Sequence, residues 1–167
     1  MKLSAVIAGI GLALSAWAES VAGIEWARPQ GWQDDPKPMR AANYLITKQP
    51  GEPEDGECGF YYFGPGQGGS IEANIKRWIG QFEPGVAPPT PKKQQINGLP
   101  VTTIDHSGVF LGGPPMGPRV KKPGYRMIAA IVEAPEGTVF IKLTGPQKTI
   151  GLAQPAFDQL LKSVRKK

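Results

Sequence analysis

The stretch ECGFYYFGPGQGGSIEANIKRWIGQF, residues 57–82, decides the fold class. Residues 57–63 predict a strand, because aromatic residues favour strands and successive side chains alternate between the two faces of a sheet. The apolar residues fall on both faces, with Cys58, Phe60 and Tyr62 on one and Tyr61 and Phe63 on the other. A strand of this kind indicates a sheet that is covered on both sides.

The glycine-rich residues 64–69 predict a turn, and an amphipathic helix is expected directly after it. Ser70 suits the N-cap position, since its hydroxyl can accept a hydrogen bond from a free amide of the first turn. We expect the helix to end near Phe82. Its apolar residues recur at helical spacing and form one stripe: Ile71, Ile75, Trp78, Ile79 and Phe82.

Further strands are predicted on both sides of this stretch, separated by glycine and proline turns. They cover residues 24–27, 39–47, 94–96, 100–110, 125–134 and 138–143. Asn97-Gly98 predicts a tight hairpin turn, and residues 112–124 predict a mobile loop or a partner-binding flap. A second amphipathic helix is predicted over residues 154–165, with the stripe Ala153, Phe157, Leu160, Leu161 and Val164.

Two helices and a hairpin-connected sheet predict the α+β class, with an antiparallel sheet held between helices in an α/β/α sandwich. The length of 167 residues suits one domain rather than two. Hydrophobic residues make up 40% of the chain, which excludes a wholly disordered protein. One cysteine excludes an internal disulfide, and one histidine excludes a His-rich zinc site. We expect neither a metal nor a cofactor.

The first 18 residues have the layout of a secretory signal peptide. Lys2 precedes an apolar run over residues 3–14, and the sequence Ala16-Trp17-Ala18 fits a small-residue cleavage site. The apolar run is shorter than the roughly 20 residues that a transmembrane helix needs. We expect cleavage after Ala18 and an exported domain of residues 19–167, periplasmic or secreted, with no stable membrane insertion. An uncleaved anchor is the alternative.

The chain is mildly basic, with a formal net charge of +5. Arg119, Lys121 and Lys122 carry part of this excess within the predicted loop. They are expected either to be solvated loop charge or to contact an anionic surface or partner. Nucleic acid is not expected as a partner, because the chain reads as exported and its basic residues do not alternate with aromatic ones.

The glycine-rich turn is one candidate binding site. Free amides and the helix dipole at a helix start attract phosphate, sulfate or carboxylate, so Gly66, Gly68, Gly69 and Ser70 are candidates for contact with a small anion. No lysine precedes Ser70, and Pro65 removes one donor, so the spacing does not fit a nucleotide-binding loop. A purely structural turn is the alternative.

A polar stripe on the first predicted helix is the second candidate. Asn74, Arg77 and Gln81 recur at helical spacing, and a guanidinium with two amides can recognise a carboxylate. The alternative is structural bracing of a neighbouring loop through acidic side chains or backbone carbonyls. The sequence leaves both interpretations open.

No catalytic constellation emerges from the sequence. On one strand His106 faces opposite to its neighbours Asp105 and Ser107, so the three cannot form a local triad. The carboxylate pairs at residues 34–35 and 54–55 lie in proline-rich loops and are expected to be solvated. Cys58 is expected to be buried and inert. Trp26, Trp32 and Trp78 are expected in the core or at its rim, with carbohydrate stacking as the alternative.

The placed segments resemble the PsbP/Mog1-like superfamily and, within it, an exported bacterial subgroup. The resemblance rests on WARPQGW at 26–32, MRAA at 39–42, the segment 68–82, FIKLTGP at 140–146 and the closing helix around 157–164. It implies an α/β/α sandwich. It also implies docking on protein partners, since better-known members dock on a photosystem in one case and on a small GTPase in another.

The function expected from these observations is an exported, non-catalytic binding or assembly module that contacts a protein partner in the cell envelope. The contact would involve the polar stripe of the first helix and the 112–124 loop. A sensor of a small ligand or anion at the glycine-rich turn is the first alternative. A hydrolase with an unrecognised catalytic set is the second.

Overall fold

A computed structural model describes residues 19–114 and 116–167. The predicted signal peptide, residues 1–18, lies outside the described residues. The strands of the described part are β1 (Glu19–Val21), β2 (Ile24–Trp26), β3 (Gln33–Asp34), β4 (Ala42–Ile46), β5 (Gly56–Tyr61), β6 (Lys92–Ile96), β7 (Leu99–Gly112), β8 (Val120–Ala134), β9 (Gly137–Pro146) and β10 (Arg165–Lys166). Its helices are α1 (Ile71–Ile79) and α2 (Gln147–Ser163).

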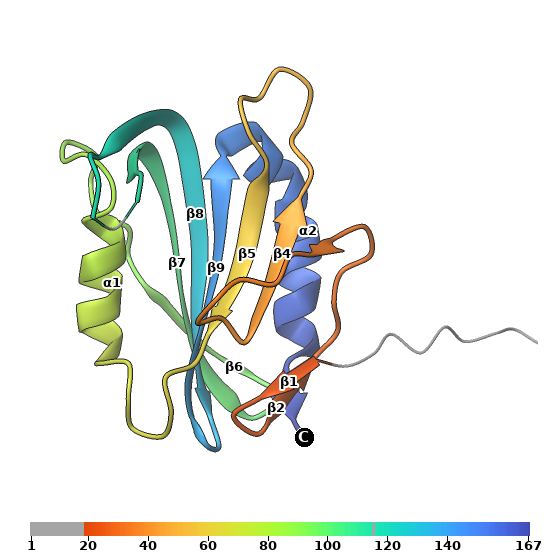
Figure 1. The fold of residues 1–167 in the computed structure, drawn as a ribbon. Helices are drawn as coiled ribbons and strands as arrows, with labels where there is room; N and C mark the ends of the chain where they lie inside the picture. The colour runs from red at the N-terminus through yellow and green to blue at the C-terminus, as the bar shows by residue number, and fades with distance from the viewer. Residues whose placement is uncertain (1–18, 115) are drawn as a thin grey trace, which may run out of the picture.

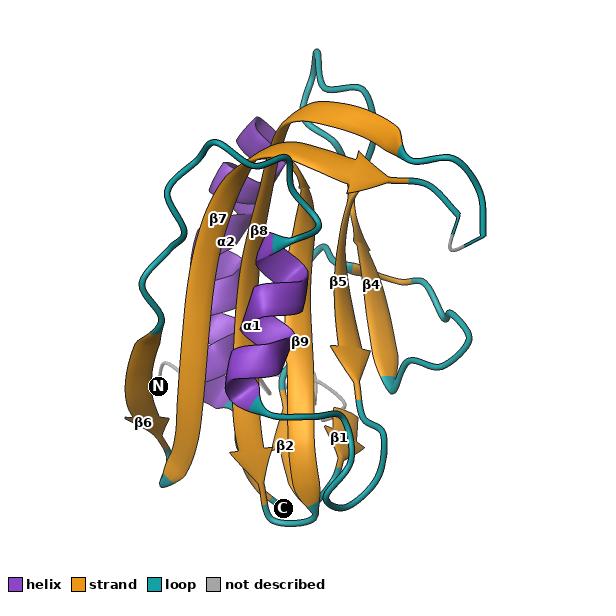
Figure 2. Ribbon diagram, turned by 90° about the vertical axis from the view of Figure 1, so that its left-hand side faces the viewer, coloured by secondary structure: helices purple, strands orange, loops and turns teal. Residues whose placement is uncertain are grey.

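The described strands form two antiparallel sheets. The main sheet has seven strands in the order β3-β4-β5-β9-β8-β7-β6, and a small sheet joins β1, β2 and β10 near the two ends of the described chain. Helices α1 and α2 lie on opposite sides of the main sheet (Figure 1). Figure 2 shows the long strands β7 and β8 curving together beyond the helical layer. This is the antiparallel α/β/α sandwich of the α+β class that the sequence predicts.

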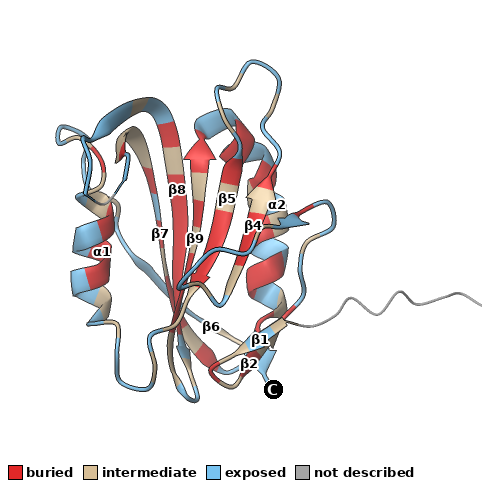
Figure 3. Ribbon diagram, viewed as in Figure 1, coloured by how far each residue is buried: buried red, intermediate tan, exposed pale blue. Residues whose placement is uncertain are grey.

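The larger core lies between the sheet and α2. Cys58 and Phe60 of β5 point into it, and the ring of Phe60 stacks on Trp26 at 4.3 Å between centroids. From α2, Ile150 and Phe157 are fully buried against the same strands. The buried residues follow the middle strands and the inner face of the helix (Figure 3). Apolar burial of this extent supplies most of the favourable free energy of folding.

A second core lies between α1 and the other face of the sheet. Ile75 and Trp78 of α1 pack there against Met127 of β8 and Phe140 of β9. Ser70 is the N-cap of α1, and its hydroxyl accepts a hydrogen bond from the amide of Ala73 at 3.1 Å. Strand β5, predicted over 57–63 and observed over 56–61, therefore separates two cores, as its apolar residues on both faces predict. Phe63 lies beyond the strand and is half exposed.

The second helix begins earlier than the sequence predicts. It was expected over 154–165, after a turn, but α2 starts at Gln147 directly after β9 and contains Pro155. Gly151 and Pro155 both weaken an isolated helix, and this is why the pattern indicated a later start. Burial of Ile150 and Ala153 against the sheet outweighs that intrinsic preference.

The predicted 112–124 loop is also too long. Gly112 pairs with Val120 and Phe110 pairs with Lys122, so only residues 113–119 connect β7 to β8. The glycines and prolines of this segment concealed the strand pairing. The predicted strand at 39–47 is likewise shorter, since β4 begins at Ala42. The short strands β1, β3 and β10 were not predicted.

Several single-residue predictions agree with the structure. Asn97 and Gly98 form the tight turn between β6 and β7, both with positive φ. His106 is buried with its ring against Phe82, and Cys58 is fully buried. The three tryptophans that were expected in the core, Trp26, Trp32 and Trp78, are buried. Neither helix of the described residues is both long and apolar enough to cross a membrane.

The packing of α2 yields a stability prediction. Ile150→Ala removes a fully buried side chain and leaves a cavity, so it is expected to lower the free energy of unfolding by about 2–5 kcal/mol. Leu152→Ala, in the same helix but exposed, is the matched control and is expected to change it by less than about 0.5 kcal/mol. Urea denaturation measures both. Equal effects of the two substitutions would contradict the assigned helix register.

Candidate functional site

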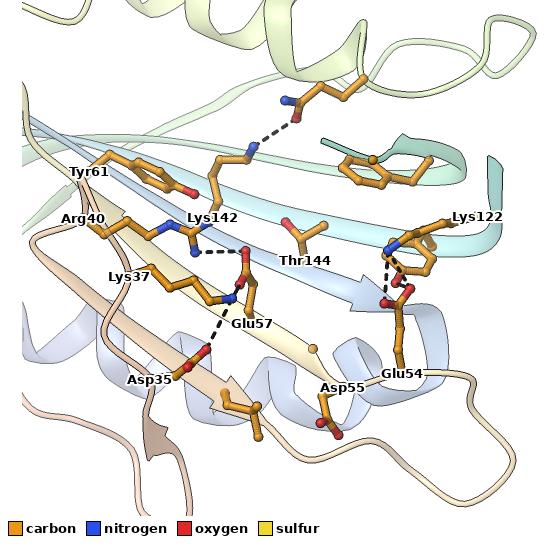
Figure 4. Close-up of a pocket in the computed structure, with 16 residues that line it drawn as sticks. Asp35, Lys37, Arg40, Glu54, Asp55, Glu57, Tyr61, Lys122, Lys142 and Thr144 are labelled. Carbon is orange, nitrogen blue, oxygen red and sulfur yellow. Dashed lines mark hydrogen bonds and ion pairs between the residues drawn. The ribbon is translucent and has the colours of Figure 1, made fainter. Parts of the chain in front are cut away.

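A cleft of about 700 Å³ opens on the α1 side of the main sheet. The buried partners of α1 come from β7, β8 and β9, whereas the cleft also reaches over β4 and β5. Because side chains alternate along a strand, the strand residues that line the cleft are the neighbours of those packed under α2. Figure 4 shows charged side chains converging on it from several elements. The charged lining residues are Asp35, Lys37, Arg40, Glu54, Asp55, Glu57, Lys122 and Lys142.

Glu57 of β5 is the centre of one ion-pair network in the cleft. Its carboxylate accepts hydrogen bonds from Arg40 at 2.9 Å and from Lys37 at 2.6 Å, and Lys37 also lies 3.3 Å from Asp35. Burial by itself raises the pKa of Glu57, but the hydrogen bond from Lys37 and the charge of Arg40 outweigh burial and lower the pKa below its ordinary value. The carboxylate is therefore ionised at neutral pH and holds both cations in place.

The position of Arg40 depends on a glycine in the neighbouring strand. A Cβ atom at Gly59 would lie 3.0 Å from the ring of Tyr61 and 3.2 Å from the guanidinium of Arg40. Without that atom, the guanidinium carbon of Arg40 lies 5.1 Å from the centroid of the Tyr61 ring, in cation–π contact. Gly59 therefore leaves the space in which these two side chains form one wall of the cleft.

A second ion pair lies at the other end of the cleft. Lys122 of β8 contacts the carboxylate of Glu54 at 2.8 Å, and the hydroxyl of Tyr125 donates a hydrogen bond to the same carboxylate. Burial raises the pKa of Glu54, but these two hydrogen bonds outweigh it and the pKa is lowered. The ring of Phe110 stacks on Tyr125 at 5.5 Å between centroids. This end of the cleft is therefore lined by two aromatic rings and a lysine from β7 and β8, namely Phe110, Tyr125 and Lys122.

Lys142 of β9 lies beside the Glu57 network, on the side nearer α1 (Figure 4). Its ammonium donates a hydrogen bond to the Gln81 side chain at 3.0 Å and lies 5.6 Å from the centroid of the Trp78 ring. Burial, together with the like charges of Arg40 and Arg77, lowers the pKa of Lys142 to about 8. Within the described residues, no carboxylate lies within ion-pair distance of Lys142 or of Arg77.

A smaller cavity of about 220 Å³ adjoins the cleft below α1. The two cavities share Tyr61, Gln81 and Lys142 in their walls, so they adjoin, and together they form the depression on this side of the sheet. The remaining lining of the smaller cavity is one cation and three aromatic rings: Arg77, Phe63, Trp78 and Phe140. It combines apolar walls with the two cations that have no carboxylate partner.

The structure separates the three residues of the predicted polar stripe. Arg77 and Gln81 line the depression, but Asn74 is fully buried behind them. The Asn74 amide donates hydrogen bonds to the carbonyls of Gly68 and Ser70, both at 2.8 Å, and its side-chain oxygen accepts one from Arg77. Asn74 therefore has the bracing geometry of the alternative interpretation.

The glycine-rich turn is shaped by packing and by Asn74. Gly66, Gly68 and Gly69 all have positive φ, and Gly64 accepts a backbone hydrogen bond from Gln67. A Cβ atom at Gly68 would lie 2.7 Å from the Phe140 ring, so a glycine is required there. These contacts describe a structural turn, and the turn lies apart from the charged cleft.

The basic residues of the predicted loop have different surroundings. Lys122 lines the cleft, as described above. Lys121 is exposed and pairs with Glu83, and the Arg119 guanidinium donates a weak hydrogen bond to the Leu111 carbonyl at 3.4 Å. Of the three, Lys122 is the one placed to contact an occupant of the cleft.

Most of the charged residues of the cleft were not predicted as a site. The carboxylates Asp35, Glu54 and Asp55 were expected to be solvated, but the structure pairs them: Asp35 with Lys37 and Asn43, Glu54 with Lys122, and Asp55 with the amide of Lys48. Lys142 could have been noticed, because it is a lone charge within the apolar strand segment VFIKL at 139–143. Its partners Gln81 and Trp78 come from a distant segment, so the sequence contains no sign of these contacts.

The side chains in the cleft are suited to holding a polar or ionic group in a defined position. Among the described residues, no three His, Cys, Asp or Glu side chains cluster in a way that could hold a metal ion. The cleft instead offers fixed ion pairs, two cations without carboxylate partners, and aromatic rings. Charge-assisted hydrogen bonds from such cations bind carboxylates more strongly than neutral donors do.

The fold is similar to that of a solved protein of the same class. The solution structure of cyanobacterial PsbP (CyanoP) from Synechocystis sp. PCC 6803 matches with a TM-score of 0.56 over 98% of both chains, at 12% sequence identity. No protein-family model matches this chain. No curated protein sequence matches it either. The chain has a PsbP-like fold, as the resemblance of its segments implied.

The lowered pKa of Lys142 yields a pH prediction. Between about pH 8, the pKa of Lys142 in the folded chain, and 10.5, the ordinary pKa of a lysine, the unfolded chain holds a proton on Lys142 that the folded chain has lost. The free energy of unfolding of the wild type is therefore expected to rise with pH across this window relative to Lys142→Met, by up to about 3 kcal/mol. Urea denaturation of both proteins from pH 7 to pH 10.5 measures the difference.

Lys148→Met, at an exposed position in the first turn of α2, is the matched control. Its stability difference from the wild type is expected to stay constant over the same pH range. A constant difference for Lys142→Met as well would contradict the burial of the ammonium group.

Proposed function

We propose that the protein is an exported, non-catalytic binding module that docks on a protein partner of the cell envelope through the cleft on the α1 side. One observation carries the proposal: Lys142 and Arg77 have no carboxylate partner among the described residues, and they lie in a depression whose other cations, Lys37, Arg40 and Lys122, are each paired with a carboxylate. An acidic group of the partner would complete these charges. The signal-peptide pattern of residues 1–18 supports export.

The rigidity of the cleft supports binding. Arg40, Lys37 and Lys122 are each held by a carboxylate, so little side-chain entropy remains to be lost when a partner docks. The aromatic side chains of the walls, Tyr61, Phe110 and Tyr125, are of the kind enriched at protein interfaces.

The structure also favours a non-catalytic role over a hydrolase. The carboxylates of Glu54 and Glu57 have lowered pKa values and are engaged by cations, which makes them weak proton acceptors. His106 is buried beside Phe82, and its neighbour Asp105 pairs with Arg126 across the strand. These contacts support a structural role for Glu54, Glu57, Asp105 and His106.

A small-anion sensor is a second candidate function, at a different place from the one the sequence indicated. The glycine-rich turn lines neither cavity, whereas Lys142 and Arg77 line the smaller one and have no carboxylate partner among the described residues. An anion site would therefore lie between Lys142 and Arg77.

Site-specific photocrosslinking tests the protein-partner proposal. Phe110 is replaced by p-benzoylphenylalanine, a conservative change at an aromatic position that lines the cleft. In cells that make the protein, this position is expected to form one defined crosslinked product with a partner. Leu152, exposed on α2 on the opposite side of the sheet, is the control position and is expected to form none.

Substitution of cleft cations provides a second test within the same crosslinking experiment. In the crosslinking protein, the pair Arg77→Gln and Lys122→Gln is expected to lower the yield of this product several-fold. The pair Lys148→Gln and Lys162→Gln on α2 is expected to leave it unchanged. Equal products from the two crosslinker positions, or none from Phe110, would refute docking through the cleft.

A further inference from the structure

The small cavity below α1 differs from the rest of the cleft in its chemistry. It joins the ammonium of Lys142 and the guanidinium of Arg77 to a wall of aromatic rings from Trp78, Phe140 and Phe63. We propose that this cavity binds the C-terminal residue of the partner, with the terminal carboxylate at the two cations and an apolar last side chain against the rings. The inference rests on the proposed function and names the part of the partner that the site recognises.

The two cations call for a carboxylate. Lys142 has one hydrogen bond, to Gln81, and an ammonium has three donors. Arg77 is exposed at the rim and donates to the buried Asn74, which fixes its guanidinium at the edge of the cavity. An incoming carboxylate would accept hydrogen bonds from both cations and relieve the repulsion between them.

The walls of the cavity call for an apolar group beside that carboxylate. Trp78 and Phe140 meet edge to face at 6.1 Å between centroids, and Phe63 lies 6.0 Å from Phe140. Phe63 is 46% exposed, and the neighbouring Met39 is 84% exposed. Together with Tyr62 these residues line a further depression, which shares Phe63 with the cavity. An apolar side chain placed here would cover surface that is otherwise open to water.

The short distance between charge and ring selects a C-terminal residue. The Lys142 ammonium lies only 5.6 Å from the centre of the Trp78 ring, so the carboxylate and the apolar group must be close together. A C-terminal residue carries both on one Cα atom. An acidic residue inside an extended segment does not, because the next side chain points to the opposite side.

The size and connection of the cavity agree with this choice. Its volume of about 220 Å³ is smaller than the roughly 300–1,000 Å³ of typical small-molecule pockets and suits one residue. It adjoins the larger cleft, with which it shares Tyr61, Gln81 and Lys142. A partner chain can therefore run along the cleft and end in the cavity.

Titration calorimetry with three peptides tests the proposal on the purified protein. The first is acetyl-Gly-Ser-Gly-Ser-Phe with a free C-terminal carboxylate, the second is the same peptide as its amide, and the third ends in Gly with a free carboxylate. The first is expected to bind, and the amide is expected to bind roughly tenfold more weakly or not at all, because it lacks the charge. The peptide ending in Gly is expected to bind more weakly than the first.

Substitutions locate the binding site. Lys142→Met and Arg77→Gln are each expected to lower the affinity for the free acid roughly tenfold while leaving the affinity for the amide unchanged. Lys76→Gln, at the exposed position next to Arg77 in α1, is the matched control and is expected to change neither. Urea denaturation of each variant verifies that it is folded.

Several outcomes would overturn the proposal. They are failure of the free acid to bind, equal affinity of acid and amide, equal affinity of the peptides ending in Phe and Gly, and displacement of the acid peptide by equimolar inorganic phosphate. The last would indicate a general anion site. Defined crosslinking at Phe110 without selective peptide binding would retain the proposed function and reject the C-terminal residue. Selective peptide binding without crosslinking would reject the cleft as a protein docking site in cells.

Discussion

The unequal cover of the two faces of the main sheet is the constraint on which the rest of the structure depends. Helix α2 has 17 residues and α1 has nine, so their lengths are about 25 Å and 14 Å. The 15 residues of β8 span about 50 Å before curvature. Helix α1 therefore covers only part of its face. Charged side chains of β5 and β9 and their neighbouring segments occupy the uncovered part.

Charges at this place must be paired or half-exposed, because burial of an isolated charge is unfavourable. Glu57 and Glu54 satisfy the condition with two donors each, and the result is a set of cations with fixed positions. Lys142 meets it only in part, through an amide oxygen and an aromatic ring. Burial and the like charges of Arg40 and Arg77 lower its pKa. An anionic group placed beside the ammonium would therefore be favourable.

The fold by itself does not decide the function, since one fold supports many activities. The similarity to cyanobacterial PsbP, at 12% identity, establishes the architecture. The proposed binding role rests instead on the particular residues of the cleft. Within the depression, Lys142 and Arg77 are the described cations without carboxylate partners, and aromatic rings lie beside them.

Local sequence patterns predicted the Asn97-Gly98 turn, the α/β/α class, the first helix and the both-faced strand. The helix was expected to reach about Phe82 but ends at Ile79, and the strand was expected at 57–63 and lies at 56–61. Each prediction depends on spacing along the chain, which the sequence contains directly. Only the tertiary structure decided the start of α2, where packing overrides Gly151 and Pro155, and the burial of Asn74 behind its helix. It also decided the cleft, because Arg40, Glu57 and Lys142 meet through the pairing of β4, β5 and β9, and contacts between distant segments leave no periodic signal in the sequence.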